Sequence, residues 1–266
     1  MGYRRNQGRH VRTSWDPVAD WYAGWVGEQG SDHHRLVAIP ALLDLLQPQR
    51  GEAILDVGAG PGVLAPYIAD TGATYTGVDA SERLLVIARR HHGAAGRFLA
   101  GDATRLAAIP GLQAAAFDAV TFLLSIQDMN PLEAVLRSAA WALRPGGRIV
   151  LLLTHPCFRV PRQSGWGWDE ERKLRFRRID RYLTPLAVPM KRYRDRKNAD
   201  RETATRSFHR PLEAYINGLA AQRLFVEHLR EIPSTITSDH ASLSSAERLA
   251  QAEFPLFLAL RARRFA

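Results

Sequence analysis

Ala53-Ile-Leu-Asp-Val-Gly-Ala-Gly-Pro-Gly62 is the stretch that decides the fold of this chain. Its first five residues are apolar apart from Asp56, which is typical of a buried parallel strand. Gly58, Gly60 and Gly62 then predict a sharp turn, because glycine tolerates positive φ and lets a ligand approach the bare backbone. A helical pattern follows at once. A strand, a glycine turn and a helix in this order place free backbone N–H groups beside the positive end of a helix, which predicts a nucleotide site.

The glycine spacing separates two nucleotide-binding families. The dinucleotide fingerprint needs G-x-G-x-x-G, and its third glycine would fall where Val63 stands. The spacing here is G-x-G-x-G, with Asp56 two residues before the first glycine. It resembles motif I, D-x-G-x-G-x-G, of the class I S-adenosylmethionine (SAM) methyltransferases, and more closely the type 11 group that acts on small molecules. The resemblance implies SAM as cofactor and S-adenosylhomocysteine (SAH) as product, bound by Asp56, Gly58, Ala59, Gly60 and Gly62.

Two acids downstream strengthen this interpretation. A predicted strand over 74–78 ends at Asp79, where a carboxylate can accept hydrogen bonds from both hydroxyls of a ribose. A third short strand is followed by Asp102 and Ala103. The resemblance implies that Asp102 binds the adenine amino group and that the backbone N–H of Ala103 meets a ring nitrogen. Ala80 and Leu123 are the remaining cofactor contacts that we expect on this side of the site.

Strand and helix patterns alternate without interruption from residue 53 to 154. Short crossovers predict parallel neighbouring strands in right-handed units. The stretch L-R-P-G-G-R-I-V over 143–150 closely resembles the element before the fifth strand of the family. The resemblance implies an α/β, Rossmann-like sheet of seven mostly parallel strands, with helices on both faces and the last strand antiparallel. We expect an N-terminal helical segment (1–48), a SAM-binding core (49–154), a basic cap inserted after the fifth strand (155–210) and a segment that completes the sheet (211–266).

The N-terminal segment predicts two helices, over about 15–25 and from 31 or 32 to 46, after a polar, basic stretch over 1–14 that we expect to be disordered. Trp15, Trp21, Tyr22 and Trp25 lie on the first helix. These aromatic side chains either fasten the helix to the domain or cover the ligand. The family often carries an aromatic residue near the methionine end of SAM, and Tyr22 is the candidate by that resemblance.

The predicted cap carries Trp166 and Trp168, which are separated by a glycine. Long connections of this kind are often lids or binding elements, so both side chains are candidate substrate contacts. Packing of the cap onto the domain is the alternative. Gln127 follows the fourth predicted strand at the ligand edge and is a third candidate substrate contact.

His155 stands directly after the fifth predicted strand, at the same edge. An imidazole with an ordinary pKa of about 6.5 suits proton removal near neutrality, so His155 is the candidate general base. Its alternative role is to hold the cap in place through hydrogen bonds. Cys157 and one neighbouring histidine are too few ligands for zinc, and we expect no metal.

Charge and composition bear on the partner. The net charge is +9, and residues 155–210 hold 16 basic and 7 acidic residues, so this segment carries the whole excess. No apolar run approaches the ~20 residues of a membrane span, and the one cysteine excludes an internal disulfide. We therefore expect a cytoplasmic enzyme that methylates a small molecule, with an aromatic or indolic metabolite suggested by the tryptophans. RNA or protein methylation through the basic cap, and SAM binding without catalysis, remain the alternatives. Nucleic acid is the less favoured partner, and the sequence does not indicate an oligomeric state.

Overall fold

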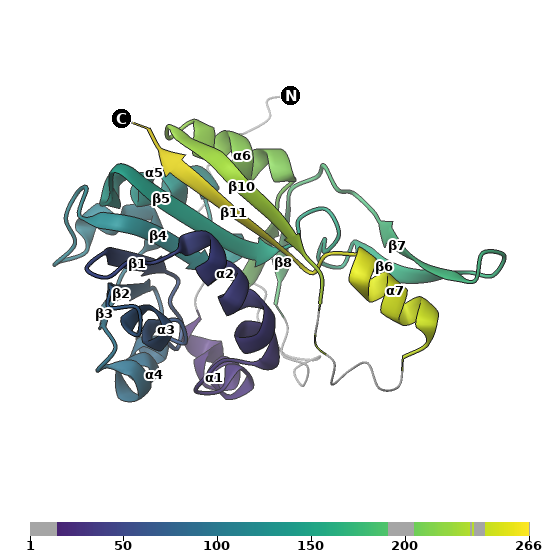
Figure 1. Ribbon diagram of the computed structural model, residues 1–266, viewed down its shortest axis with the longest axis horizontal. Coiled ribbons are helices and arrows are strands. Elements are labelled where there is room, and N and C mark those ends of the chain that lie inside the picture. Colours follow the sequence, from purple (N-terminus) through teal and green to yellow (C-terminus); the bar gives the residue numbers. More distant parts are fainter. Residues whose placement is uncertain (1–14, 191–204, 235, 237–242, 266) are drawn as a thin grey trace, which may run out of the picture.

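The structure, a computed structural model, describes residues 15–190, 205–234, 236 and 243–265 (Figure 1). Within these residues the core is a seven-stranded sheet with the order β10-β11-β5-β4-β1-β2-β3. Neighbours from β5 to β3 are parallel, whereas β11 is antiparallel to both β5 and β10. This arrangement confirms the predicted Rossmann-like sheet with an antiparallel last strand. The strands are β1 (Ala53–Val57), β2 (Thr74–Asp79), β3 (Arg97–Ala100), β4 (Phe117–Leu123), β5 (Leu143–Thr154), β10 (Leu224–Ile232) and β11 (Phe257–Arg264).

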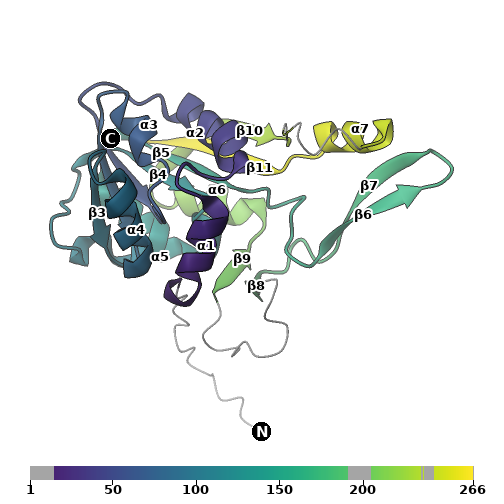
Figure 2. The same ribbon diagram turned by 90° about the horizontal axis from the view of Figure 1, so that it is seen from below.

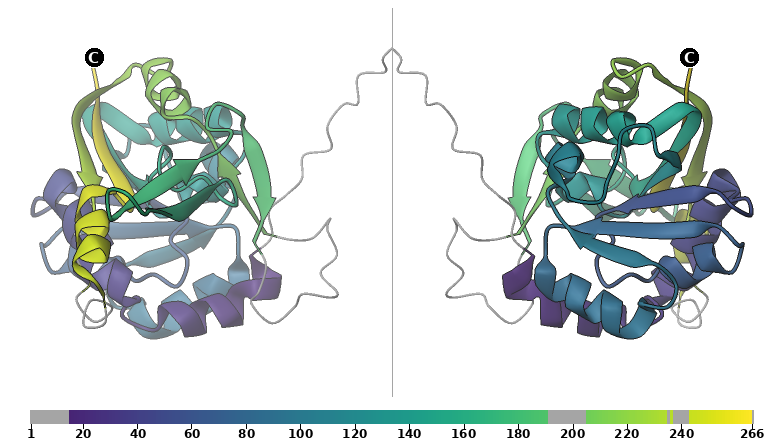
Figure 3. Two further views of the ribbon diagram at one scale, coloured as in Figure 1. Left: turned by 90° about the vertical axis from the view of Figure 1, so that its right-hand side faces the viewer. Right: turned by 90° about the vertical axis from the view of Figure 1, so that its left-hand side faces the viewer.

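Helices cover both faces of the sheet. Because side chains on both faces are buried, the sequences of the central strands are nearly continuous runs of apolar residues. Successive side chains of a strand point to opposite faces. Ile54 accordingly packs in the core beneath α2, α3 and α4, while Leu55 and Val57 pack in the core beneath α5 and α6. Figure 3 shows these two helix layers on opposite sides of the sheet. The helices are α1 (Ala19–Val26), α2 (Ile39–Leu46), α3 (Ala65–Ala69), α4 (Glu82–His92), α5 (Leu132–Ala142), α6 (Leu212–Ala220) and α7 (Ser245–Glu253).

The strand order places a topological switch between β1 and β4. The chain leaves β1 toward β2 and β3, and it returns across the sheet to β4 and β5. Ligands of open α/β sheets bind outside the carboxyl ends of the strands at such a point. The fold therefore positions one ligand crevice at the carboxyl ends of β1, β2 and β4.

The N-terminal segment lies across this edge of the sheet. The predicted first helix is a short 3-10 turn, Asp16–Val18, followed by α1. The hydroxyl of Ser81, in the turn after β2, donates a hydrogen bond of 2.5 Å to the carboxylate of Asp16. The second helix runs through a π-helical turn, His34–Ala38, into α2. The expectation of disorder over 1–14 falls outside the described residues.

The insert after β5 forms two small antiparallel pairs. β6 (Ser164–Asp169) pairs with β7 (Leu174–Ile179), and β8 (Leu186–Pro189) pairs with β9 (Arg206–His209). The β6–β7 hairpin extends away from the main sheet, with α7 beside it (Figure 2). The β8–β9 pair instead lies close to the loop that follows β4, because β9 packs against it.

The apolar pattern over 254–261 predicts the last strand, but no apolar pattern directly before it predicts a helix. The structure places helix α7 before that strand and begins β11 at Phe257. The signal for α7 is present in the sequence as Ser244 followed three residues later by Glu247. These residues form a capping box, in which each side chain bonds the backbone N–H of the other residue.

Candidate active site

The glycine turn after β1 has the backbone that its sequence predicts. Gly58, Gly60 and Gly62 have φ values of +78°, +55° and +81°. A Cβ built on Gly58 would lie 2.5 Å from the Cβ of Ser125 and 2.7 Å from the Cε of Met129. The N–H of Gly58 donates to the carbonyl of Val78, at 2.7 Å, which ties the loop to β2. The loop therefore requires glycine for its conformation and, at Gly58, for space against the loop after β4.

Asp79 connects the glycine loop to the turn after β2. One carboxylate oxygen accepts the N–H of Gly60 at 2.8 Å, and the other accepts the N–H of Ser81 at 2.8 Å. Burial raises the pKa of Asp79, while these backbone hydrogen bonds oppose the rise. The side chain is thus held in one orientation at the carboxyl end of the strand.

A cavity of about 820 Å³ opens over the carboxyl ends of β1, β2 and β4. Its wall contains eight of the residues predicted for the cofactor: Tyr22, Gly58, Gly60, Asp79, Ala80, Asp102, Ala103 and Leu123. The volume suits a ligand of drug or nucleoside size. The structure therefore brings these residues together in one space, although they come from the N-terminal helix, the turns after β1, β2 and β3, and the ends of β2 and β4.

Tyr22 reaches this cavity from α1. Its ring packs edge-to-face on Trp15, with 5.0 Å between centroids, and it lies 3.7 Å from the position of a Cβ on Gly60. Burial raises the pKa of Tyr22, and the negative charges of Asp128 and Asp79 raise it further. The first helix thus places an aromatic hydroxyl among the carboxylates of the site, beside the glycine loop.

Asp56 does not lie on the cavity wall, so the expectation of a direct cofactor contact is not supported. It is buried behind the loop, where the hydroxyl of Tyr75 donates to it at 2.7 Å and that of Thr121 at 3.1 Å. Burial raises the pKa of Asp56 to about 6. The motif I acid therefore ties β1 to β2 and β4, beneath the site.

Three further expected contacts also lie off the wall. Ala59 and Gly62 belong to the glycine loop but face the core, where a Cβ on Gly62 would meet the ring of Phe98 at 2.8 Å. The amide of Gln127 donates to the carbonyl of Leu124 at 2.5 Å and caps its own turn. Neither Gln127 nor the two loop residues lines the cavity.

His155 is 1% exposed and does not line the cavity. Its Nε2 lies 2.9 Å from a carboxylate oxygen of Glu231, and its Nδ1 accepts the N–H of Cys157 at 3.2 Å. Burial lowers the pKa of His155, against the opposing effect of Glu231. Both ring nitrogens are engaged in holding β5 and β10 to the start of the insert. This geometry fits the anchoring alternative and does not support the expectation of a general base.

Trp166 and Trp168 lie on β6, on the hairpin that extends away from the cavity. The ring of Trp166 packs against Phe254, with 5.3 Å between centroids, and the guanidinium groups of Arg175 and Arg177 lie over it at 5.2 and 5.1 Å. Trp168 is 43% exposed. The structure therefore supports the packing alternative for Trp166 and gives neither tryptophan a place against a substrate in the cavity.

The sequence interpretation missed several residues of the cavity wall, of which Asp128 is chemically the most informative. Asp128 and Asn130 follow the fourth strand, at the edge of the sheet where the sequence predicts the ligand. The remaining wall residues supply apolar, hydroxyl-bearing or basic surface: Trp15, Val78, Leu84, Gly101, Thr104, Arg105, Leu124, Ser125, Met129, Pro131, Ala134 and Arg137.

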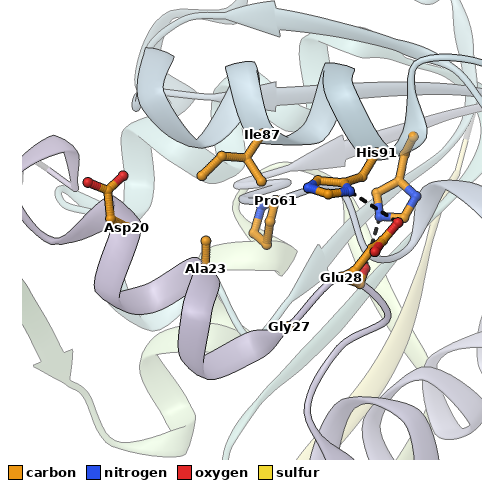
Figure 4. Close-up of a pocket in the computed structure, with 8 residues that line it drawn as sticks. Asp20, Ala23, Gly27, Glu28, Pro61, Ile87 and His91 are labelled. Atoms are coloured by element: carbon orange, nitrogen blue, oxygen red, sulfur yellow. Dashed lines mark hydrogen bonds and ion pairs between the residues drawn. The ribbon is translucent and has the colours of Figure 1, made fainter.

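A second, smaller cavity of about 300 Å³ lies between α1 and α4 (Figure 4). Its His91 and His92 both bond Glu28, through the carboxylate at 3.1 Å and the backbone carbonyl at 3.0 Å. Pro61 is the one residue of the glycine loop on the wall of this smaller cavity. The two histidines therefore fasten the end of α1 to α4. Across the described part of the chain, no cluster of three or more His, Cys, Asp or Glu side chains is arranged to hold a metal.

Comparison of the sequence with known proteins finds a matching domain family and several curated relatives. Residues 55–151 match the methyltransferase domain family. A ubiquinone biosynthesis O-methyltransferase of Idiomarina loihiensis is 37% identical over 99 residues, which are 37% of this chain and 41% of that protein. A demethylmenaquinone methyltransferase of Tropheryma whipplei is 36% identical over 121 residues, 44% of this chain and 48% of that protein. The aligned stretches thus span about half the length of these curated relatives.

The solved structures extend the likeness beyond the core. An S-adenosylmethionine-dependent methyltransferase from Mesorhizobium loti superposes with a TM-score of 0.67 at 27% identity, and the match covers 90% of this chain and all of the other. None of the helices in the described residues is both long and apolar enough to cross a membrane.

Proposed function

We propose that this protein, whose fold and domain family are those of the class I SAM-dependent methyltransferases, transfers the methyl group of SAM to a small-molecule acceptor. The observation that carries the proposal is the shared cavity. The glycine loop, the acid at the end of β2 and the Asp102–Ala103 pair line the same space of about 820 Å³. This is the arrangement that an adenosyl ligand with an amino-acid tail requires.

The residues on the wall fit SAM group by group. Asp79 would accept hydrogen bonds from the ribose hydroxyls, because its carboxylate is fixed and faces the cavity. The backbone of Gly58 and Gly60 would lie against the methionine portion, and Asp102 with Ala103 would lie against the adenine. When bound, SAM supplies an electrophilic methyl group on a sulfonium sulfur. The protein's contribution is alignment of the acceptor, which can be worth about 7–11 kcal/mol in well-oriented systems.

We propose a phenolic or related aromatic compound as the acceptor class. The support is the names of two curated relatives, a ubiquinone biosynthesis O-methyltransferase and a demethylmenaquinone methyltransferase, and a cavity wall that includes Trp15, Tyr22, Leu124 and Met129. The tryptophans of the insert no longer support an indolic acceptor, because neither lines the cavity.

The basic insert gives limited support for a polyanionic acceptor. Arg175 is bound to Glu247 at 3.0 Å, and Arg178 lies 3.2 Å from Asp180. Residues 191–204, which hold 6 of the 16 basic residues of the insert, lie outside the described residues. We keep the division into N-terminal helical segment, SAM-binding core, insert and sheet-completing segment as a proposal for how the chain is organised around the cavity.

Calorimetry with SAH, followed by methyl transfer from labelled SAM to a panel of phenols, hydroquinones and amines, tests the function. We expect SAH to bind and at least one aromatic acceptor to be methylated. Methylation of RNA or protein in preference to every small molecule would establish a macromolecule as the methyl acceptor. SAH binding without turnover across the panel would favour a non-catalytic SAM-binding protein.

A further inference from the structure

Asp128 is a carboxylate on the cavity wall for which the cofactor assignments leave no role. It lies in the short 3-10 turn Ile126–Asp128, directly after β4, and is 9% exposed. The same stretch of wall carries Tyr22, Gly58 and Ser125. The glycine loop and Tyr22 are the groups expected beside the methionine portion of SAM. Asp128 therefore faces the part of the cavity where the methyl acceptor has to enter.

We propose that Asp128 accepts the proton of the methyl acceptor during transfer, and that Ser207 and Arg210 of the insert position its carboxylate. This inference rests on the proposed function, because it assigns a role within the same reaction. It also assigns the proton-accepting role to a group inside the cavity, whereas both ring nitrogens of His155 are engaged outside it.

The insert reaches Asp128 through β9 and the residues after it. Ser207, on β9, donates a hydrogen bond to the carboxylate of Asp128. Arg210 donates to the carbonyl of Met129 at 2.6 Å and to the side-chain oxygen of Asn130 at 3.1 Å. Its guanidinium also lies 5.2 Å from the centroid of the Phe208 ring. The end of the insert therefore fixes the loop that carries Asp128.

Titratable groups from three elements face Asp128. Arg210, at the end of the insert, is positively charged, whereas Tyr22 of α1 and Tyr215 of α6 present neutral hydroxyl groups. Burial raises the pKa of Asp128 to about 7, although the hydrogen bond from Ser207 and the charge of Arg210 oppose this rise. A carboxylate with a pKa near the working pH is a stronger proton acceptor than an exposed one and is still largely ionised above neutrality.

The step balances without another reagent. A hydroxyl acceptor gives its proton to the carboxylate of Asp128, and the oxygen lone pair forms a bond to the methyl carbon. The bond between that carbon and the sulfonium sulfur breaks, and its electron pair stays on sulfur as the neutral thioether SAH. The methylated product is neutral, and Asp128 is left as a carboxylic acid. The proton then leaves to solvent, and the ionised carboxylate is restored.

The test compares wild type with Asp128→Asn, Ser207→Ala and Asp70→Asn, which removes an exposed aspartate at the end of α3 as the matched control. Besides the carboxylic acid of Asp56, which titrates near pH 6, infrared titration of the SAH complex should show one carboxylic acid in wild type that ionises with a midpoint near pH 7. That signal should vanish in Asp128→Asn, shift to higher pH in Ser207→Ala and persist in Asp70→Asn. SAH affinity should stay within a few-fold in all four proteins, because the glycine loop and Asp79 are unchanged.

Turnover supplies the second readout, with hydroquinone as the phenolic probe. The wild-type rate should rise with pH to a plateau above about 7, and Asp128→Asn should lower it 10²- to 10⁴-fold, the usual contribution of a positioned base. Wild-type turnover in Asp128→Asn would overturn the assignment, and so would persistence in this variant of the carboxylic acid that titrates near pH 7. Failure of wild type to bind SAH would overturn the proposed function itself, and this inference with it.

Discussion

Gly58→Ala and Gly146→Ala make a matched pair that isolates the close approach at the glycine loop. Both glycines have similar positive φ values, +78° and +74°. An alanine at either position therefore carries the same backbone cost of about 1–2 kcal/mol. A Cβ at Gly146 would meet nothing within 4 Å, whereas one at Gly58 would lie 2.5 Å from the Cβ of Ser125 and 2.7 Å from the Cε of Met129. Carbon atoms in contact lie about 3.5–4.0 Å apart, so both neighbours would have to move.

The movement at Gly58 has a structural and a functional consequence. Ser125 would have to give up or strain its hydrogen bond to the carbonyl of Val57, now 2.7 Å long. Overpacking of this kind costs about 1–3 kcal/mol, so Gly58→Ala should be less stable than Gly146→Ala by about that amount in urea unfolding. Because Ser125 and Met129 line the cavity, SAH affinity should fall by at least about tenfold, or 1.4 kcal/mol. In Gly146→Ala, SAH affinity should stay within about twofold. Equal stability and equal SAH affinity in the two variants would refute this account of the loop.

Three further predictions address other parts of the molecule. Asp79→Ala should weaken SAH binding about 10- to 150-fold in calorimetry, the equivalent of about 1.5–3 kcal/mol of charge-assisted hydrogen bonds, and unchanged affinity would remove Asp79 from the site. Trp166→Ala should lower the melting temperature, because the ring packs on Phe254, but leave SAH affinity unchanged; a large loss of affinity would contradict its placement outside the cavity. His34 is buried, and burial lowers its pKa to about 4, below the ordinary 6.5 of an unfolded chain. The unfolded state therefore binds the extra proton, so wild type should lose up to about 3 kcal/mol of stability as the pH falls from 6.5 to 4, and His34→Gln should lose less. Identical pH dependence of unfolding in the two proteins would contradict this burial effect.

The local patterns of the sequence were sufficient for the core of the fold. The apolar run before Gly58 and the acid at the end of the second strand are short-range signals, and each one corresponds to an element of the structure. The fifth strand is also present, but it begins at Leu143 and includes the residues that resemble the element before it. The parallel order of the strands follows because short crossovers allow few other arrangements. The structure also brings Tyr22 into the cavity from α1, and its contact with the bound methionine portion stays a prediction.

The errors concern the direction in which side chains point and contacts across long separations. Asp56 and His155 stand at the expected positions along their strands, but the sequence does not indicate that their side chains turn toward Tyr75 and Glu231 rather than toward the ligand. The link between Asp128 and Ser207 joins the loop after β4 to the end of the insert, and no local pattern encodes it. Polar residues at a ligand edge can therefore be recognised from sequence, whereas their partners require the tertiary structure.

A crystal structure of the protein with SAH tests the central claim most directly. The account predicts SAH in the large cavity, with its ribose hydroxyls on the carboxylate of Asp79, its adenine beside Asp102 and Ala103, and its sulfur on the side of Asp128. SAH bound elsewhere, or in this cavity with the ribose away from Asp79, would contradict the account.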